Sequence, residues 1–304
     1  MDAIVGYTGF VGSNIYASHK FDNAYNSKNI GSAYGTEPDI LVYAGVRAEK
    51  YIANSEPKKD YESILEAERN ISLIRPKKLV LISTIDVFPS PVNVNEETQI
   101  TESELNPYGY NRLCLENMIR EKYPDALIVR LPGLFGKNIK KNFIYDMINI
   151  IPSKLREDKL AELSLKEPSI RDAYISLNNG FYQLDPLSDK KRLKEIFMSV
   201  GFTAVNFTDS RSVYQFYNLA RLWDDIRTAL DNDLRLLHLA TEPLSAAEIY
   251  RRIFDKNFIN EISSVPANYD FRTKYGPLYG SNNEYLVDRE TVLDEICAFV
   301  KSSL

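Results

Sequence analysis

Three evenly spaced glycines, Gly6, Gly9 and Gly12, follow a short apolar run at residues 3–5. In a strand-to-helix turn, the first glycine permits the sharp turn, the second lets a pyrophosphate approach the backbone, and the third lets helix and strand pack closely. The helix N-terminus adds amide donors and partial positive charge for phosphates. The spacing is G-x-x-G-x-x-G and not G-x-G-x-x-G, so a purely structural turn is the alternative. The position at the first strand–helix junction favours a dinucleotide site.

Apolar runs and helical patterns alternate along the first part of the chain. Strands are predicted at 3–5, 23–26, 39–46, 78–83 and 126–130, and helices at 14–20, 58–74 and 110–123. Short buried strands separated by helices indicate a parallel sheet with helices on both faces. The sequence therefore predicts an α/β protein with a Rossmann-type, doubly wound parallel sheet. The segment before Asp39 is too short for a full helical crossover, so this part of the nucleotide domain is expected to be abbreviated.

The pattern changes after Gly136. Residues 137–207 show no regular strand spacing, 212–230 is predicted as an aromatic-rich helix, and 234–240 as one more buried strand. Ser245 with Glu248 predicts a capping box, and a closing helix is expected from Asp288. The predicted dinucleotide-binding domain comprises 1–136 and about 211–255. The remaining segments, about 137–210 and 256–304, are expected to form a smaller substrate-binding cap.

Composition narrows the class of protein. The net charge of −5 in 304 residues contains no basic tract, which argues against nucleic acid as the main partner. Only two histidines, His19 and His238, are present, so no histidine-rich metal site is expected. The two cysteines, Cys114 and Cys297, are too few for a disulfide framework and fit a reducing compartment. No apolar run approaches the roughly 20 residues that span a bilayer, and no signal peptide is recognised, so a cytoplasmic protein is expected.

Further motifs follow the glycine turn in a fixed order. They are Ala44-Gly45, Ser83-Thr84, Tyr108-x-x-x-Arg112 and Arg130-Leu-Pro-Gly-Leu-Phe-Gly136. This order resembles the extended short-chain dehydrogenases/reductases, the family of sugar-nucleotide epimerases, dehydratases and reductases. The run Ser83-Thr84-Ile85-Asp86-Val87-Phe88 is most similar to the branch that contains dTDP-4-dehydrorhamnose reductase. The motifs cover about the first 136 residues, and the rest of the chain fits only loosely.

The resemblance implies Tyr108 as the catalytic acid/base and Thr84 as its partner, with Ser83 as the adjacent alternative. Hydride transfer between a nicotinamide and a carbinol carbon requires a proton to reach or leave the oxygen. A tyrosine does this when a nearby cation lowers its pKa from roughly 10 toward neutrality. A hydroxyl such as that of Thr84 holds and polarises the substrate oxygen. For each residue alone, packing or a strand end is the alternative interpretation.

Arg112 departs from the family motif, which has lysine four residues after the tyrosine. The spacing places Tyr108 and Arg112 on one helical face, so the positive charge is kept. In the family, the lysine also hydrogen-bonds the nicotinamide ribose, and the planar fork of an arginine is not an equivalent donor. The substitution leaves fold and cofactor binding intact and makes catalytic strength an open question.

The cofactor is expected to be NADP, with NAD as the alternative. No acidic residue follows the second strand to accept from an adenosine ribose, whereas Ser27 and Lys28 offer contacts to a 2′-phosphate. A solvated lysine in a turn is the competing interpretation. Together, the glycine turn and the resemblance predict cofactor contacts at Gly6, Thr8, Gly9, Phe10, Val11, Gly12, Ser27, Lys28, Ala44, Gly45, Val46, Ser83, Tyr108, Arg112, Leu131, Pro132 and Gly133.

The resemblance implies a nucleotide-activated sugar as the small-molecule substrate. Candidate substrate contacts are Thr84, Asp86, Asn142 and Arg211, of which the last two would serve a diphosphate. A 4-keto reductase is favoured over an epimerase, and a dehydratase ranks last because Thr84 lacks an adjacent Asp-Glu pair. The competing class is a non-catalytic NAD(P)-binding protein that senses redox state or binds a partner. Family members often dimerise through the helices beside the tyrosine motif, so the resemblance leaves a homodimer open.

Overall fold

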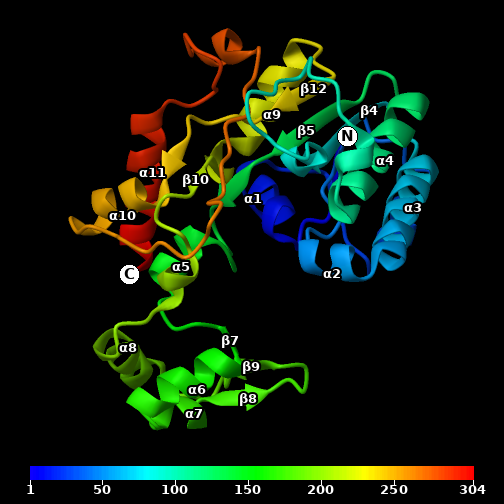
Figure 1. Ribbon diagram of the computed structural model, residues 1–304. Helices are drawn as coiled ribbons and strands as arrows, with labels where there is room; N and C mark the ends of the chain where they lie inside the picture. Colours follow the sequence, from blue (N-terminus) through cyan, green and yellow to red (C-terminus); the bar gives the residue numbers. More distant parts are fainter. The chain divides into compact units, whose positions relative to one another are not determined.

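The computed structural model describes all residues from Met1 to Leu304. The chain forms two compact units, followed from end to end in Figure 1. The first unit comprises Met1–Ile139, Val213–Leu244 and Asn268–Glu295, and the second comprises Lys140–Ser212, Ser245–Ala267 and Ile296–Leu304. The assignment of one part to a dinucleotide and the other to a substrate stays a prediction.

A six-stranded, wholly parallel sheet forms the centre of the first unit. Its order is β12-β5-β4-β3-β1-β2, as the pairings of neighbouring strands show. The strands are β1 (Asp2–Val5), β2 (Asn23–Tyr25), β3 (Ile40–Tyr43), β4 (Lys78–Thr84), β5 (Leu127–Leu131) and β12 (Leu236–His238). All five residues of β5 are buried, which fits a parallel strand covered on both faces. The predicted doubly wound sheet is confirmed.

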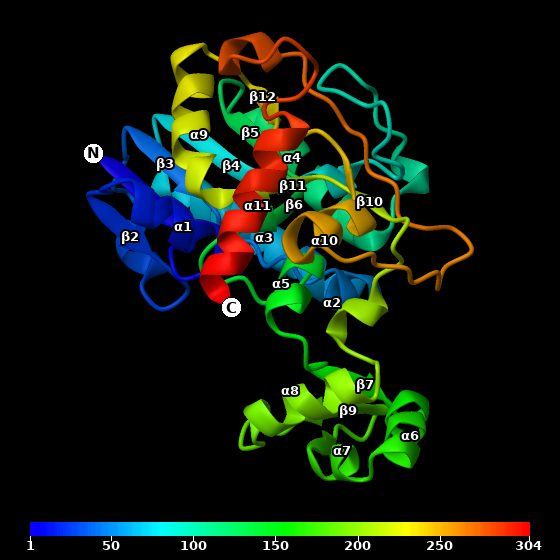
Figure 2. The same cartoon turned by 90° about the vertical axis from the view of Figure 1, so that its left-hand side faces the viewer.

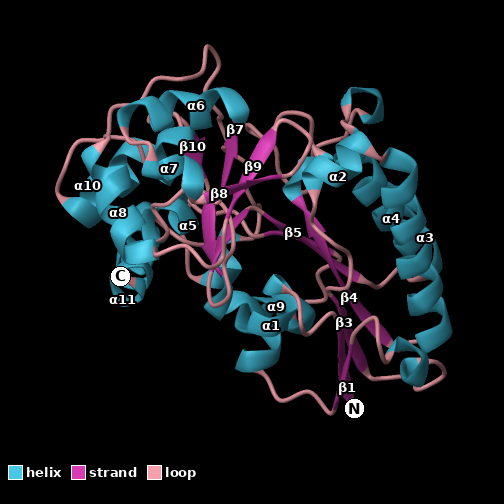
Figure 3. Ribbon diagram, turned by 90° about the horizontal axis from the view of Figure 1, so that it is seen from below, coloured by secondary structure: helices cyan, strands magenta, loops and turns pink.

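Helices cover both faces of this sheet, and Figure 3 shows α1 and α9 on one face and α3 and α4 on the other. The helices of the first unit are α1 (Phe10–Ser18), α2 (Lys50–Ser55), α3 (Pro57–Ile74), α4 (Pro107–Lys122) and α9 (Leu222–Asp231). Short 3-10 turns join them at η1 (Ile30–Ala33), η2 (Ile85–Val87), η3 (Glu102–Glu104), η5 (Leu219–Arg221) and η6 (Gly276–Tyr279). Apolar residues of α3 and α4 pack on the sheet in one buried cluster.

The connection between β2 and β3 is abbreviated, as expected. It contains only the 3-10 turn η1 and returns the chain to the other side of β1. The strand order therefore reverses between β1 and β3, and in open α/β sheets ligands bind at the carboxyl ends of the strands at such a point. The glycine turn follows β1 at this place.

The predicted aromatic helix at 212–230 is wrong in its first half. Residues there form β10 (Val213–Tyr214) and β11 (Phe216–Asn218), and the helix α9 begins only at Leu222. Strand β11 pairs in parallel with β6 (Gly133–Phe135), with Phe216 opposite Gly133. Helical spacing of the aromatics was misleading because this long-range pairing outweighs local propensity. Strand β10 pairs with β13 (Leu244–Ser245).

The second unit contains a small antiparallel sheet that the sequence pattern did not reveal. Its order is β7-β9-β8, formed by β7 (Lys154–Arg156), β8 (Tyr174–Ser176) and β9 (Phe181–Leu184). Figure 2 shows α6 (Glu157–Lys166), α7 (Ser169–Asp172) and α8 (Lys190–Ser199) around it. A separate cluster that includes Leu155, Leu163 and Phe197 forms its core. The strands are too short to show an alternating pattern in the sequence.

The remaining helices are α5 (Phe143–Ile148), α10 (Ala246–Phe254) and α11 (Arg289–Ser303), with the 3-10 turn η4 at Ala204–Phe207. The predicted capping box opens α10, because Ser245 and Glu248 bond each other's backbone amides. Both cysteines are free thiols, and no group of histidine, cysteine or acidic side chains has the arrangement of a metal site. No helix combines the length and apolarity that crossing a membrane requires.

Candidate active site

The glycine turn joins β1 to α1 as predicted, and its backbone leaves no room for side chains at two positions. Gly6 has a φ of +91°, and a Cβ there would lie 2.4 Å from the carbonyl oxygen of Ala44. A Cβ on Gly12 would lie 2.2 Å from the carbonyl oxygen of Gly6, so only glycine lets α1 pack this closely on the strand end. The first and third glycines therefore have the predicted steric roles.

The start of α1 fits a phosphate. Gly9 is the N-cap and makes no side-chain hydrogen bond to the first turn, which contains no acidic residue. The amides at the start of a helix have no partner within the helix, so this turn retains donors for an anion. Thr8, Phe10 and Val11 lie in this turn, and Ala44 and Gly45 approach it from the end of β3. The residues present fit a dinucleotide pyrophosphate.

The loop after β2 is held by asparagine side chains. Asn26 accepts the backbone N–H of Lys28, and Asn29 accepts that of Asn26. Ser27 and Lys28 are exposed on this loop. Their contact with a 2′-phosphate stays a prediction.

Asn106 and Pro107 start α4 three residues earlier than predicted. Asn106 caps the helix by accepting the N–H of Gly109 at 3.0 Å, and Pro107 occupies the first turn, where a missing N–H costs nothing. Tyr108 therefore lies in the first turn of the helix, with its backbone N–H bonded to the side chain of Asn54 in α2. A Cβ on Gly109 would lie 2.2 Å from the carbonyl oxygen of Asp86. This glycine lets the helix start pack against the segment that follows β4.

Thr84, Asp86 and Tyr108 come together at this packing contact. Thr84 Oγ1 donates to Asp86 Oδ2 at 3.0 Å, and Thr84 lies near enough to the phenol of Tyr108 to affect its pKa. Tyr108 is 4% exposed. Burial raises the pKa of Tyr108, and Asp86 raises it further, whereas Arg112, Lys50 and the nearby Thr84 hydroxyl lower it. The expected lowering by Arg112 is present, but burial outweighs it.

Arg112 lies on the same helical face as Tyr108, with its guanidinium carbon 4.6 Å from the ring centroid. Its two terminal nitrogens donate to Asp60 of α3 at 3.0 and 3.1 Å, and one of them also donates to the carbonyl oxygen of Arg47 at 2.6 Å. Asn111 donates to the same carboxylate at 2.8 Å. The arginine is thus a buried, paired charge.

Lys50, at the start of α2, was not predicted as a site residue. Its Nζ lies 2.7 Å from Asp86 Oδ2 and 5.9 Å from the Tyr108 ring centroid. Burial lowers the pKa of Lys50, but the charges of Asp86, Tyr269 and Tyr108 raise it above its ordinary value. The lysine is therefore cationic at neutral pH. No sequence signal points to it, because it is far from Tyr108 along the chain.

Ser83 has a different environment from its neighbour Thr84. It donates to Glu116 at 2.6 Å, and the same fully buried carboxylate accepts from Arg130 at 3.0 and 2.6 Å. Arg130 also lies 3.2 Å from the ring of His238, whose pKa burial and the Arg130 charge lower to about 3. The Ser83 hydroxyl is thus engaged in a buried network below the sheet end. Thr84, not Ser83, is the hydroxyl beside Tyr108.

Leu131 ends β5, Gly133 begins β6, and Pro132 lies between them. A Cβ on Gly133 would lie 2.8 Å from the carbonyl oxygen of Gln215, so glycine is required for the pairing with β11. Val46 follows β3 and packs against the cluster beside the sheet. The nicotinamide-side and adenine-side contacts of these residues stay predictions.

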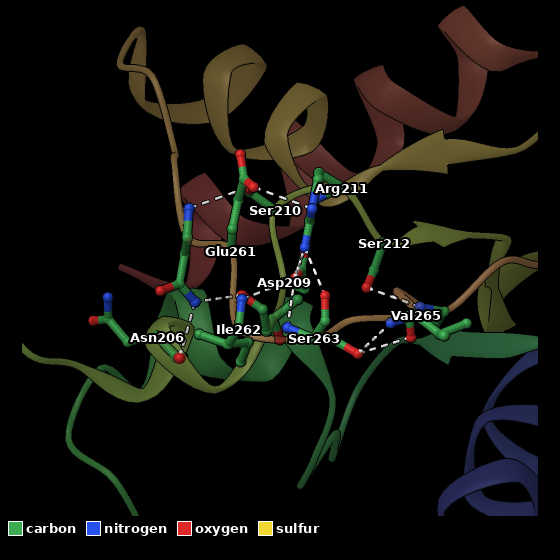
Figure 4. A network of polar contacts seen from close by, with 12 residues as sticks. Asn206, Asp209, Ser210, Arg211, Ser212, Glu261, Ile262, Ser263 and Val265 are labelled. Carbon is green, nitrogen blue, oxygen red and sulfur yellow. Dashed lines mark hydrogen bonds and ion pairs between the residues drawn. The ribbon is translucent and has the colours of Figure 1, made fainter.

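Asn142 and Arg211 belong to the second unit. Asn142 caps α5 by accepting the N–H groups of Ile144 and Tyr145 at 3.0 and 3.2 Å. Figure 4 shows Arg211 inside a polar network, where its guanidinium donates to Asp209 at 3.0 and 2.8 Å and to the carbonyl oxygen of Ser263 at 2.7 Å. Glu261 lies 3.1 Å from the same group. Both predicted substrate residues therefore have local structural partners.

Asp209 is the centre of that network. Besides Arg211, it accepts the backbone N–H groups of Ile262 and Ser263, each at 2.9 Å. The hydrogen bond from Arg211 and those from the backbone hold the pKa of Asp209 well below its usual range, against the opposing effect of burial. This network fixes two loops of the second unit to each other.

Comparison with protein families identifies one match. The model described as "RmlD substrate binding domain" matches residues 4–162, about half of the chain. This range contains the glycine turn, Thr84, Asp86, Tyr108 and Arg112.

Solved structures of similar fold cover nearly the whole chain. The dTDP-4-dehydrorhamnose reductase from Bacillus anthracis, in complex with NADP, is 17% identical with a TM-score of 0.65, covering 99% of this chain and 97% of that chain. RMD from Pseudomonas aeruginosa, complexed with NADPH, is 12% identical with a TM-score of 0.63, covering 100% and 99%. The Bordetella bronchiseptica enzyme WbmG, in complex with NAD and UDP, is 12% identical with a TM-score of 0.65, covering 99% and 94%. At these identities the likeness shows the fold.

A different match is partial. Over 142 residues, the chain is 26% identical to the ATPase family gene 2 protein of Saccharomyces cerevisiae, which is 46% of this chain and 17% of that protein. The chain thus spans about a sixth of the length of this curated relative. It contains no G-x-x-x-x-G-K-S/T phosphate loop, so the shared stretch carries no nucleotide site of that type.

Proposed function

The chain belongs to the RmlD substrate binding domain family, and from this premise we propose that it is an NADP-dependent reductase of a nucleotide-activated sugar. The observation that carries the proposal is the buried phenol of Tyr108, which lies beside Thr84 at the carboxyl end of β4, in the sheet whose strand β1 leads into the glycine turn.

In this proposal Tyr108 and Thr84 act on the substrate oxygen. When bound, the dinucleotide supplies the hydride that reaches the carbonyl carbon. Tyr108 gives its proton to the carbonyl oxygen, so that ketone, hydride and proton together give the alcohol and leave the phenolate. Thr84 donates a hydrogen bond to the same oxygen and stabilises the charge that develops on it. General acid catalysis of this kind contributes about 10²- to 10⁴-fold in rate.

The first unit offers the parts of a dinucleotide site. The turn at Gly6–Gly12 and the uncapped start of α1 would hold the pyrophosphate. Ser27 and Lys28 would contact the 2′-phosphate of NADP, and no acidic side chain stands in that loop to repel it. The similar structures contain NADP, NADPH or NAD, which supports a nicotinamide dinucleotide without deciding between the two forms.

A 4-keto sugar nucleotide is the proposed substrate class. The family match and the likeness to dTDP-4-dehydrorhamnose reductases support a reductase, and the UDP bound to WbmG supports a nucleoside diphosphate. Asp86 would face the sugar hydroxyls. Asn142 and Arg211 are the candidates for the diphosphate, although each already has local partners.

The second candidate is a non-catalytic NAD(P)-binding protein. Arg112 is the observation that favours it, because its fork is occupied by Asp60 and by the carbonyl oxygen of Arg47. It is thus not available in the way that the family's lysine is for a nicotinamide ribose. Retention of the Thr84–Tyr108 pair argues for the enzyme.

The two candidates are separated by turnover. The purified chain is mixed with NADPH or NADH and a panel of 4-keto sugar nucleotides, and loss of the reduced cofactor is followed with product analysis. We expect NADPH-dependent reduction of at least one member. Binding of NADPH without hydride exchange across the panel would favour the non-catalytic protein.

A further inference from the structure

Two cations lie against the ring of Tyr108, and they come from different elements. The Arg112 guanidinium carbon is 4.6 Å from the ring centroid and belongs to the same helix as the tyrosine. Lys50 Nζ is 5.9 Å from the centroid and is supplied by α2. The family motif has a single cation at the position of Arg112. With a second cation present, either of the two could stabilise the phenolate of Tyr108.

Arg112 is held by structural contacts. Its side chain is 5% exposed and its partner Asp60 is 10% exposed, so this is a buried ion pair. Both terminal nitrogens are bound by the carboxylate, and one also by a backbone carbonyl. Its positive charge is matched by Asp60, and moving the fork would leave a buried charge unpaired, which is strongly unfavourable.

Lys50 is placed differently. Its side chain is 52% exposed, whereas that of its partner Asp86 is 17% exposed. Asp86 Oδ2 accepts from both Lys50 Nζ at 2.7 Å and Thr84 Oγ1 at 3.0 Å, so one oxygen holds the ammonium and the hydroxyl together. The contacts thus run from Thr84 through Asp86 to the half-exposed Lys50 side chain, beside the buried phenol of Tyr108.

We propose that Lys50, and not Arg112, is the positioning residue that has the role of the family's motif lysine in this chain. Its ammonium compensates the charge of Asp86 beside Tyr108 and stabilises the phenolate that remains after the proton has passed to the substrate oxygen. This inference rests on the proposed reductase function. It assigns Arg112 to holding α4 on α3.

Arg112 lowers the pKa of Tyr108 more than Lys50 does, but Lys50 is the cation that is paired with Asp86. Burial and Asp86 raise the pKa of Tyr108, and Arg112, Lys50 and Thr84 lower it. Around Lys50, burial lowers the pKa, while Asp86, Tyr269 and Tyr108 raise it. If Lys50 were neutral or absent, Asp86 would remain uncompensated next to the phenol. An opposite charge within about 4–6 Å shifts a pKa by about one to three units, so the loss of Lys50 should be measurable.

The test compares Lys50→Met with Lys50→Arg and with Lys58→Met, an exposed lysine of α3 that serves as a matched control. The rate is measured against pH in the direction of sugar oxidation, where the phenolate of Tyr108 is the active form. Without Lys50 the phenol deprotonates only at higher pH. We expect the rate of Lys50→Met at neutral pH to fall about tenfold and to recover in alkali. The rise of the pH–rate profile should then occur about one pH unit higher than in the unmodified chain.

Further variants test whether the charge at Lys50 or at Arg112 sets the pH dependence. Lys50→Arg keeps a cation, so its pH–rate profile should not be shifted. Lys58→Met should have the same profile as the unmodified chain. Asp86→Asn removes a negative charge and should move the profile to lower pH. A wild-type profile in Lys50→Met would overturn the proposal, and so would a shift that follows Arg112→Met and not Lys50→Met.

A readout without turnover separates this inference from the proposed function. The ultraviolet difference between the chain and its Tyr108→Phe variant isolates the titration of Tyr108 from that of the other tyrosines. The same difference is taken in the Lys50→Met background. If no sugar nucleotide is reduced, the proposed function fails, but an upward shift of this titration still supports the role of Lys50. An unchanged titration contradicts that role.

Discussion

Asp86 in the first unit and Asp209 in the second both hold basic side chains, but they use their oxygens differently. Asp209 accepts from the Arg211 guanidinium and from the backbone amides of Arg211, Ile262 and Ser263. Asp86 shares one oxygen between Lys50 and Thr84, beside a buried tyrosine. A carboxylate whose acceptor sites are all filled by fixed donors ties loops together. One that orders a hydroxyl and a half-exposed ammonium around an ionisable phenol is suited to proton transfer.

Asp60 belongs with Asp209 in this comparison, although it lies close to Tyr108. It accepts from both terminal nitrogens of Arg112 and from Asn111, all of which are buried. Asp60 therefore holds the helix that bears the tyrosine, and Asp86 lies beside the tyrosine itself. The two roles make different predictions for substitution.

The largest effect on rate is expected at Tyr108. Tyr108→Phe keeps the ring and the contact with Arg112 but removes the proton donor, so turnover should fall by about 10²- to 10⁴-fold. NADPH affinity and the melting temperature should remain nearly unchanged. Steady-state rates and a fluorescence titration of NADPH measure both. Full activity in this variant would contradict the acid/base role of Tyr108. Asp86 would then have no part in proton transfer that distinguishes it from Asp209.

A large effect on stability is expected at Asp60. Asp60→Ala leaves Arg112 buried without its counterion, which costs about 3–5 kcal/mol of unfolding free energy. The double variant Asp60→Ala with Arg112→Met removes both charges and should recover much of the loss. Urea denaturation of the single and double variants gives the comparison. Equal stability of Asp60→Ala and the unmodified chain would show that Arg112 is not fixed by this pair.

Substitution of Asp209 should affect stability and its acid dependence but not cofactor binding. Asp209→Asn loses the charge that binds Arg211 and should lower the melting temperature by several degrees, with unchanged NADPH affinity. Because folding lowers the pKa of Asp209, its contribution is complete above the ordinary carboxyl pKa of about 4 and is lost as the pH falls toward the lowered value. The acid slope of stability should therefore be shallower in the variant. A loss of NADPH binding would contradict a purely structural network.

The smallest effect is expected at Lys28. Lys28→Ala should weaken NADPH binding about fivefold, the scale of ~1 kcal/mol for an exposed charge contact, and should leave NADH binding unchanged. Lys20→Ala, another exposed lysine of the first unit, is the control. Equal weakening of both cofactors, or of neither, would remove the proposed 2′-phosphate contact.

Local patterns predicted the parallel sheet and the glycine turn, because buried strands and glycine spacing are local signals. Thr84 and Tyr108 were implied by the family resemblance, and their catalytic roles stay predictions. Lys50 and Asp60 could not be found in this way. Asp60 meets Arg112 across 52 positions of chain, and only the packing of α2 and α3 on α4 brings them there. The strand pairing of β11 with β6 escaped for the same reason, since it joins segments far apart in the sequence.

The central claim, hydride transfer by a nicotinamide dinucleotide at this site, is tested most directly with NADPH deuterated at the transferable position of the ring. The reaction is run with the 4-keto sugar nucleotide that the chain turns over, and the product is analysed by mass spectrometry and NMR. The account predicts one deuterium at the former carbonyl carbon, with about 10²- to 10⁴-fold less labelled product from Tyr108→Phe over the same time. NADPH binding without deuterium transfer to any member of the panel would contradict it.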